Sequence, residues 1–298
     1  MKGIVITGAT GMIGANTAKL ALDQGYSVLC IIRPGSEKEK NIPQHPNLKI
    51  AYADISGYNE IAVDGHYDVF IHLAWEKTFG NARDDTDAQL RNIQYTLDAV
   101  HLAKRLGCTA FIGAGSQAEY GPVQCKLSGS TPVNPLSGYG IAKYTAGKLS
   151  RLLCSQLGLR HNWVRILSVY GTLDNSYTLI SYVADCCKKG VAPELTKCEQ
   201  VWDYINEQDA AAAFIAIAER GMDGKAYALG SGNGQSLYSY IEKMIEILNP
   251  AIEPCFGSKQ YYPNQPMYLV ADISELTHDT GWLPRVTFEK GILSFIDQ

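Results

Sequence analysis

Short apolar runs alternate with longer helical patterns along the first half of the chain, and this rhythm is typical of βαβ units. The run 69–73 has no polar alternation, which favours a parallel sheet that helices cover on both faces. The pattern therefore predicts an α/β fold with a doubly wound parallel sheet. The expected strands are 4–6, 27–32, 48–53, 69–74 and 110–112, and the expected helices are 12–24 and 84–106.

The second half of the chain continues this pattern and then departs from it. A helix over 137–157 and a strand over 162–169 follow the same rhythm, whereas after Gly171 short mixed elements are separated by Pro and Gly. The alanine-rich run 206–220 is again helical. The expected domains are a first one over 1–170, rejoined by about 204–220, and a smaller mixed α/β region over 171–298 that is interleaved with it.

The composition indicates a folded protein and narrows its partners. Hydrophobic residues make up 46% of the 298 residues and charged residues 19%, which is enough for a packed core. The net charge of −4 argues against a nucleic-acid partner that binds through bulk positive charge. The longest apolar helical stretch, 210–218, is far shorter than the about 20 residues that span a bilayer, so no membrane insertion is expected.

The eight cysteines are scattered and form no C-x-x-C pair, so neither a zinc site nor a redox pair is expected, and we expect no metal. Scattered cysteines usually lie buried as small apolar residues. The sequence opens directly into an apolar strand with no signal peptide ahead of it. We therefore expect a reducing, cytoplasmic location.

A glycine-rich turn with the spacing G-x-x-G-x-x-G lies between the first expected strand and the first expected helix. Glycines at such a turn let the backbone approach a pyrophosphate, and the helix N-terminus supplies N–H donors to it. A glycine turn without a ligand is the alternative interpretation. The residues expected to form the dinucleotide site are Gly8, Thr10, Gly11, Met12, Ile13 and Gly14.

The end of the second expected strand indicates which dinucleotide is bound. An acidic residue there would bind the ribose 2′-hydroxyl of NAD, whereas a cation would bind the 2′-phosphate of NADP. No acid occurs before Glu37, and Arg33 offers a planar fork for a phosphate, with Ser36 beside it. This favours NADP(H), with NAD(H) possible if Arg33 is only a solvated strand end. Asp54 would either accept a hydrogen bond from the adenine or cap the following helix.

Ser116, Tyr139 and Lys143 form the candidate catalytic group. Tyr139 and Lys143 are four residues apart on an expected helix, so both side chains project from one face. A nearby ammonium favours the phenolate and suits the tyrosine to proton exchange, while Ser116 would hold the substrate oxygen. Tyr144 and Lys148 repeat the same spacing five residues later, turned by about 140° around the helix. We choose Tyr139 because Pro135 and Gly138 lead into it.

The ordered motifs resemble the extended short-chain dehydrogenase/reductase superfamily, in particular its members that modify nucleotide sugars. The matching motifs are the turn 7–14, Asp54-Ile55, His72-Leu73-Ala74-Trp75, Asn92, Ser116 with Tyr120-Gly121, Tyr139 to Lys143, and Trp202 to Ile205. The resemblance implies a Rossmann-type sheet, a nucleotide-sugar site in the C-terminal region and a homodimer. It also implies that Ser116, Tyr139 and Lys143 are catalytic, that Asn92 supports the active-site helix, and that the cofactor contacts include Asp54, Ile55, Leu73, Ala74, Tyr139 and Lys143.

Two departures from the family pattern refine this expectation. Sugar-nucleotide 4,6-dehydratases carry an Asp-Glu pair directly after the residue aligned with Ser116, but here Gln117 and Ala118 occupy those places. Glu119 follows one place too late, and on an extended segment it would point the other way. A 4,6-dehydratase is therefore disfavoured.

The second departure concerns the substrate phosphates. Relatives similar to UDP-galactose 4-epimerase have Arg at the place of Trp202 and Asn at the place of Ser168. A pyrophosphate would need other partners, for which Lys188, Lys189 and Lys197 are candidates, although a solvated helix end and loop explain these lysines equally well.

Three functions remain after this comparison. The first is NADP-dependent reduction of a 4-keto nucleotide sugar with Tyr139 as the proton donor. The second is an NAD(P)-dependent nucleotide-sugar 4-epimerase, which would use the same residues twice, and the third is a non-catalytic dinucleotide-binding sensor. Among neighbouring residues, His72 is expected to be structural, and Arg83 and Arg91 lie near the expected mouth of the site.

Overall fold

A seven-stranded parallel sheet forms the centre of the computed structural model, which describes residues 3–63, 65–262 and 265–296. Its strand order is β10-β6-β5-β4-β1-β2-β3. The reversal between β1 and β4 is the switch point of a doubly wound sheet, where ligands of such folds bind. The strands are β1 (Gly3–Thr7), β2 (Ser27–Ile32), β3 (Leu48–Tyr52), β4 (Val69–His72), β5 (Ala110–Ser116), β6 (Arg160–Ile166) and β10 (Ala226–Leu229).

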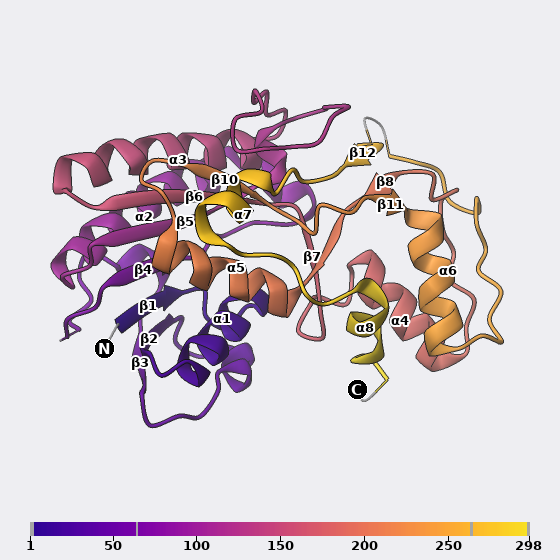
Figure 1. Ribbon diagram of the computed structural model, residues 1–298, viewed down its shortest axis with the longest axis horizontal. Coiled ribbons are helices and arrows are strands. Elements are labelled where there is room, and N and C mark those ends of the chain that lie inside the picture. Colours follow the sequence, from indigo (N-terminus) through magenta and orange to yellow (C-terminus); the bar gives the residue numbers. More distant parts are fainter. Residues whose placement is uncertain (1–2, 64, 263–264, 297–298) are drawn as a thin grey trace.

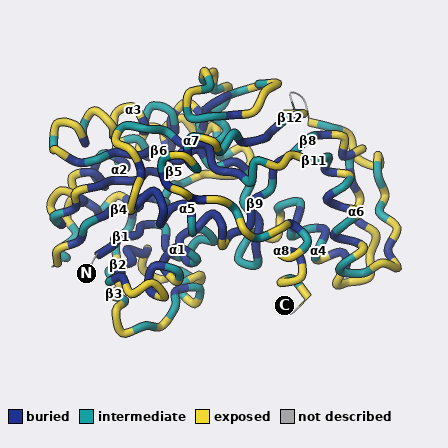
Figure 2. The backbone as a smooth tube through the Cα atoms, viewed as in Figure 1, coloured by how far each residue is buried: buried dark blue, intermediate teal, exposed yellow. Residues whose placement is uncertain are grey.

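Two pairs of helices cover the faces of this sheet. Helices α1 (Met12–Asp23) and α5 (Glu207–Arg220) lie side by side on one face, and α2 (Thr86–Arg105) and α3 (Gly138–Leu157) lie side by side on the other (Figure 1). The strands β1, β4 and β5 are buried along their whole length, as Figure 2 shows. Burial on both faces explains why these strands read as continuous apolar runs.

The second region packs beside this sheet around its own apolar core. The aromatic rings of Tyr204, Tyr240 and Phe288 meet there, with centroids 5.2 Å apart for Tyr204–Tyr240 and 4.5 Å apart for Tyr240–Phe288. Its helices are α4 (Leu179–Lys189), α6 (Leu237–Leu248) and α8 (Phe288–Leu293), and its strands are β7 (Ser168–Tyr170), β8 (Val201–Trp202), β9 (Tyr204–Asn206), β11 (Gln235–Ser236) and β12 (Tyr268–Leu269). Helix α7 (Ser274–Thr280) packs instead against α5 and against β10 of the central sheet.

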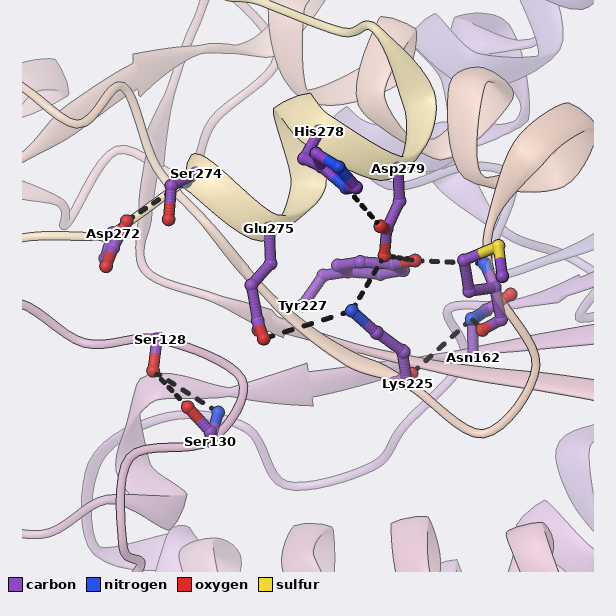
Figure 3. Close-up of polar contacts among 11 residues, drawn as sticks. Ser128, Ser130, Asn162, Lys225, Tyr227, Asp272, Ser274, Glu275, His278 and Asp279 are labelled. Carbon is purple, nitrogen blue, oxygen red and sulfur yellow. Dashed lines mark hydrogen bonds and ion pairs between the residues drawn. The ribbon is translucent and has the colours of Figure 1, made fainter.

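Helix α7 is attached to the border strand β10 by a polar cluster (Figure 3). The carboxylate of Asp279 accepts a hydrogen bond from the Tyr227 hydroxyl at 2.9 Å and pairs with Lys225 at 3.1 Å. Glu275, one helical turn earlier, lies 4.0 Å from the same ammonium. The C-terminal part of the chain is thereby fixed to the central sheet.

The doubly wound parallel fold predicted from the sequence is confirmed, and most element bounds agree within two residues. The single strand expected over 162–169 is two strands in the structure, which are separated at Leu167. β6 ends at Ile166 in the central sheet, and β7 begins at Ser168 and pairs with β9 in a separate two-stranded sheet. Among the described residues, no helix has both the length and the apolar character of a bilayer span.

Candidate functional site

The turn between β1 and α1 has the geometry that the glycine spacing predicts. Gly8 has φ +68°, and a β-carbon there would lie 2.8 Å from the backbone nitrogen of Ala74. A β-carbon at Gly14 would collide with the Gly8 carbonyl oxygen. Both positions therefore require glycine, one for its backbone conformation and one for the close packing of helix against turn.

The N-terminus of α1 is open to an anionic ligand. The N-cap residue is Gly11, which has no side chain to accept the first N–H groups of the helix. The N–H groups of Met12 and Ile13 thus have no acceptor within the helix and project from its positive end. A dinucleotide pyrophosphate fits this cradle in charge and in hydrogen bonding. Thr10 lies in the same turn, where its carbonyl oxygen accepts a hydrogen bond from Asn41 at 3.0 Å.

The other predicted cofactor residues follow neighbouring strands at the same edge of the sheet. Arg33 is exposed immediately after β2. Asp54 accepts hydrogen bonds from the backbone N–H of Ser56 at 3.2 Å and from its hydroxyl at 3.0 Å, so it caps the short 3₁₀ helix that starts at Ile55. Leu73 and Ala74 follow β4, and both backbone N–H groups donate to Thr7.

Ser116, Tyr139 and Lys143 come together at the carboxyl end of β5. Ser116 is the last residue of β5, and its side chain lies close enough to the Tyr139 hydroxyl to lower the pKa of that phenol. Lys143 lies one turn further along α3, where its Nζ donates to the Ala114 carbonyl oxygen at 2.8 Å. The same ammonium lies 3.7 Å from the ring centroid of Trp75 and 5.8 Å from that of Tyr139. A half-buried phenol therefore lies beside a buried hydroxyl and a buried ammonium.

Burial dominates the ionisation of both titratable groups. It raises the pKa of the Tyr139 phenol, and the Ser116 hydrogen bond and the positive charge of Arg83 act in the opposite direction. Burial lowers the pKa of Lys143 to about 7, partly offset by the negative charge of Glu119. The lysine therefore changes its charge close to neutral pH, in the range where a proton-transfer site works.

The position of Glu119 differs from the prediction. The segment after Ser116 is a 3₁₀ turn, Gln117–Glu119, rather than an extended strand, so the Glu119 side chain turns back toward Ser116. Its carboxylate accepts the Ser116 backbone N–H at 2.9 Å and the indole N–H of Trp163 at 2.9 Å, and it pairs with Arg165 at 2.8 Å. All of these contacts are buried, so Glu119 is part of the scaffold beneath the site.

Asn92 on α2 holds the loop that follows β4. Its side chain accepts the backbone N–H of Glu76 at 3.0 Å and donates to the Glu76 carbonyl oxygen at 3.1 Å. The adjacent Gln89 accepts the indole N–H of Trp75 at 3.0 Å. These contacts position the Trp75 ring, which supports Lys143. The sequence pointed to Asn92 but not to Gln89 or to this role of Trp75.

His72 is a structural residue. Its Nδ1 lies 2.8 Å from the Thr7 hydroxyl, across the paired strands β1 and β4. Burial and the nearby charge of Lys143 lower the pKa of His72 to about 3, so the ring is neutral at physiological pH. The alternative pair Tyr144 and Lys148 is turned by about 140° around α3 from Tyr139 and lines a pocket with Glu119 and Trp163, where the ammonium is 5.4 Å from the Tyr144 ring centroid.

The lysines that the sequence suggests as phosphate contacts lie at an exposed helix end and in an exposed loop. The indole N–H of Trp202 donates to the hydroxyl of Ser168 at 2.7 Å, so the two positions that depart from the 4-epimerase pattern contact each other. Lys189 pairs with Asp185 at 2.6 Å at the exposed end of α4. Lys188 and Lys197 are exposed. Among the described residues, no group of three His, Cys, Asp or Glu side chains could hold a metal ion.

Comparison with known proteins identifies the family of the chain. The model of the NAD dependent epimerase/dehydratase family matches residues 4–230. The chain is 27% identical over 265 residues to the dTDP-6-deoxy-L-talose 4-dehydrogenase (NAD(+)) of Aggregatibacter actinomycetemcomitans, covering 85% of this chain and 93% of that protein. It is 22% identical to a dTDP-glucose 4,6-dehydratase of Mycobacterium tuberculosis, covering 99% of this chain and 92% of that protein.

A solved structure extends the similarity to the whole fold. The UDP-N-acetylglucosamine 4-epimerase from Methanobrevibacter ruminantium, in complex with UDP-N-acetylmuramic acid, superposes with a TM-score of 0.90. The two chains are 22% identical, and the match covers 99% of this chain and 97% of that one.

Proposed function

The chain belongs to the NAD dependent epimerase/dehydratase family, and on that premise we propose that it catalyses the NADP-dependent reduction of a 4-keto nucleotide sugar. Its family makes it an enzyme of the extended short-chain dehydrogenase/reductase type that uses a nicotinamide dinucleotide, so the sensor interpretation is set aside. The observation that carries the proposal is the grouping of the Ser116 and Tyr139 side chains beside the buried ammonium of Lys143.

The residues of this site suit the transfer of a proton to a carbonyl oxygen. When bound, the nicotinamide would supply the hydride for the carbonyl carbon. Ser116 would orient the substrate oxygen by a hydrogen bond, and Tyr139 would give that oxygen its phenolic proton. The phenolate that remains is stabilised by the Ser116 hydroxyl and by the neighbouring positive charges. The product would be a 4-hydroxy sugar.

Net redox chemistry at C4 is favoured by one relative and by two residues. The relative described above with 27% identity is named as a 4-dehydrogenase of a dTDP-6-deoxy sugar. The reverse of such a dehydrogenation is the reduction of a 4-ketone. The positions after Ser116 that would carry a dehydratase's acid pair are Gln117 and Ala118. Elimination of water would lack its acid and base here.

A nucleotide-sugar 4-epimerase is the second candidate, because the 4-epimerase fold superposes over nearly the whole chain. An epimerase oxidises and then reduces the same sugar, so it produces no net change in cofactor absorbance. The deciding experiment denatures the freshly purified protein, identifies any released dinucleotide by mass spectrometry, and then assays dTDP-, CDP- and UDP-linked 4-keto-6-deoxy sugars with NADPH. Net oxidation of NADPH supports the reductase. Retained NAD with interconversion of 4-hydroxy epimers and no net oxidation would identify an epimerase.

The preference for NADP(H) over NAD(H) depends on Arg33. Its guanidinium is exposed at the end of β2, where the adenosine ribose of a dinucleotide would lie in this fold. The relative named above carries NAD(+) in its name, so NAD(H) is the alternative that a titration of both cofactors tests.

A homodimer in a reducing compartment completes the proposal. Exposed apolar side chains lie on the outer surface of α2 and α3, where Leu90 is 67% exposed, Ile141 50% and Leu152 61%. Such a surface favours a partner. All eight cysteines are free, which fits the cytoplasm. Light scattering on the purified protein tests the dimer.

A further inference from the structure

We propose that Arg83 is a positioning residue of the active site, which lies against the Tyr139 ring and promotes the ionisation of its hydroxyl. This inference rests on the proposed role of Tyr139 in proton transfer. It adds a group that lies in another part of the chain and that no family motif in this sequence contains.

The geometry places the guanidinium against the phenol ring. The Cζ atom of Arg83 lies 4.6 Å from the ring centroid of Tyr139, whereas the ammonium of Lys143 is 5.8 Å from the same centroid. A cation within about 6 Å of an aromatic face is attracted to it. The attraction grows when the hydroxyl loses its proton and the ring becomes an anion.

The loop that carries Arg83 is fastened to the helix that carries Tyr139. Arg83 lies in the short 3₁₀ helix Gly80–Asp84. The carboxylate of Asp84 accepts the backbone N–H of Gly138 at 2.8 Å, one residue before Tyr139. A β-carbon at Gly138 would lie only 3.1 Å from the Arg83 carbonyl oxygen, so the two segments are closely packed. These backbone contacts hold the Arg83 loop next to the Tyr139 ring.

The charge of Arg83 is not engaged elsewhere. Its Nε is buried without a hydrogen-bond partner, and none of the ion pairs found within residues 3–63, 65–262 and 265–296 includes Arg83. A buried guanidinium N–H without a partner is costly. Among the ion pairs, aromatic contacts and cation–ring contacts of the described residues, the Tyr139 ring is the partner found for this guanidinium.

Lys143 alone supplies a weaker and more variable charge. Its ammonium donates to the Ala114 carbonyl oxygen and lies on the Trp75 ring. Burial lowers its pKa to about 7, so it loses its charge as the pH rises through neutrality. An arginine keeps its charge over the whole working range. Above neutral pH, Arg83 is the lasting positive charge beside the phenol.

The remaining groups around Tyr139 act in known directions. The Ser116 hydroxyl, from β5, donates to the phenolate and lowers the pKa of Tyr139, whereas the carboxylate of Glu119, from the following turn, raises it. Trp75, from the loop after β4, presents its ring at 85° to the Tyr139 ring with centroids 6.1 Å apart. Arg83 is thus the charge that opposes both burial and Glu119.

The test measures the pKa of Tyr139 in the folded protein with saturating oxidised dinucleotide. Tyrosine labelled with ¹³C at Cζ gives a signal that moves on ionisation, and Tyr139→Phe identifies the signal of this residue. We expect Arg83→Gln to raise the pKa of Tyr139 by about one unit. Arg83→Lys, which keeps a charge, should restore at least half of the shift. Arg91→Gln, which removes an exposed arginine from nearby α2, is the matched control and should leave the signal unchanged.

The kinetic counterpart is the pH profile of sugar oxidation, in which Tyr139 must accept a proton. We expect the rise of kcat with pH to move to higher pH by about one unit in Arg83→Gln, a loss of about tenfold below that pH. An unchanged Tyr139 pKa in Arg83→Gln, or equal shifts in Arg83→Gln and Arg83→Lys, would overturn the inference. The labelled signal needs no sugar, so a protein that reduces no 4-ketone would refute the proposed reaction without affecting this result.

Discussion

The carboxylate of Glu119 holds the backbone N–H of Ser116 at 2.9 Å and at the same time pairs with Arg165 at 2.8 Å. Both side chains of the ion pair are almost fully buried. The turn that presents the Ser116 hydroxyl to Tyr139 is therefore stabilised from beneath by one buried charge pair.

Glu119→Gln should destabilise the protein strongly, because it leaves the Arg165 charge buried without its partner. A loss of about 3 kcal/mol in the free energy of unfolding is expected. Glu275→Gln is the control, since Glu275 lies 4.0 Å from Lys225 in a partly exposed pair and should cost less than about 1 kcal/mol. Chemical denaturation of the three proteins measures both values, and equal losses would show that the Glu119 pair has no special weight.

Tyr139→Phe should abolish turnover while leaving dinucleotide affinity nearly unchanged. The substitution removes only the hydroxyl that we propose transfers the proton, an effect of about 10²- to 10⁴-fold for a general acid. Tyr144→Phe removes the same atom from a position about 140° further around α3 and should do little. Steady-state rates and a cofactor titration distinguish the two, and the reverse pattern would assign the chemistry to Tyr144.

Arg33→Ala should weaken NADPH binding selectively. The guanidinium is expected to bind the 2′-phosphate through charge-assisted hydrogen bonds, whose loss costs about tenfold or more in affinity. Lys40→Ala, from the exposed segment that follows, is the control. Fluorescence titration with NADPH and NADH measures the effect. If both cofactors weaken equally in Arg33→Ala, the 2′-phosphate contact is wrong.

Lys143 should make the stability of the protein depend on pH. Its pKa is about 7 in the folded protein and near 10.5 in an exposed lysine, so between these values the unfolded chain binds more protons than the folded one. Stability then rises with pH in this window. Relative to Lys143→Met, the wild-type protein should gain about 1 kcal/mol per pH unit between pH 8 and pH 10. Denaturation curves at several pH values measure this dependence, with Lys148→Met as the control. A wild-type stability that does not rise with pH relative to Lys143→Met would contradict the prediction.

The sequence predicted the central sheet well because its signals are local. The strands β1, β2 and β4 are mostly apolar runs, and the Gly8–Gly14 turn marks the start of α1. Ser116, Tyr139 and Lys143 could be grouped because helical spacing and a family pattern both apply to them. The prediction agrees with the structure where residues close together in the sequence determine the local fold.

The remainder depends on contacts between distant segments. On an extended segment, the Glu119 side chain is predicted to point away from Ser116. In the structure this segment is a 3₁₀ turn, in which Glu119 contacts Arg165 and Trp163. The predicted strand is divided at Leu167 because β7 pairs with β9, which comes from a later part of the chain. Arg83 was noted only as a residue near the mouth, because its place over Tyr139 depends on the Asp84–Gly138 contact.

β10 pairs with β6 at the border of the sheet, although β7, α4, β8, β9 and α5 lie between them in the chain. A gene fragment that stopped after β6 would leave the outer edge of that strand open to pairing with other chains. A single crossover near residue 170 between this gene and a relative would import α5 and β10 together with the C-terminal region. Chimaeras that aim to exchange sugar recognition therefore need several junctions, so that α5 and β10 remain with the sheet on which they pack.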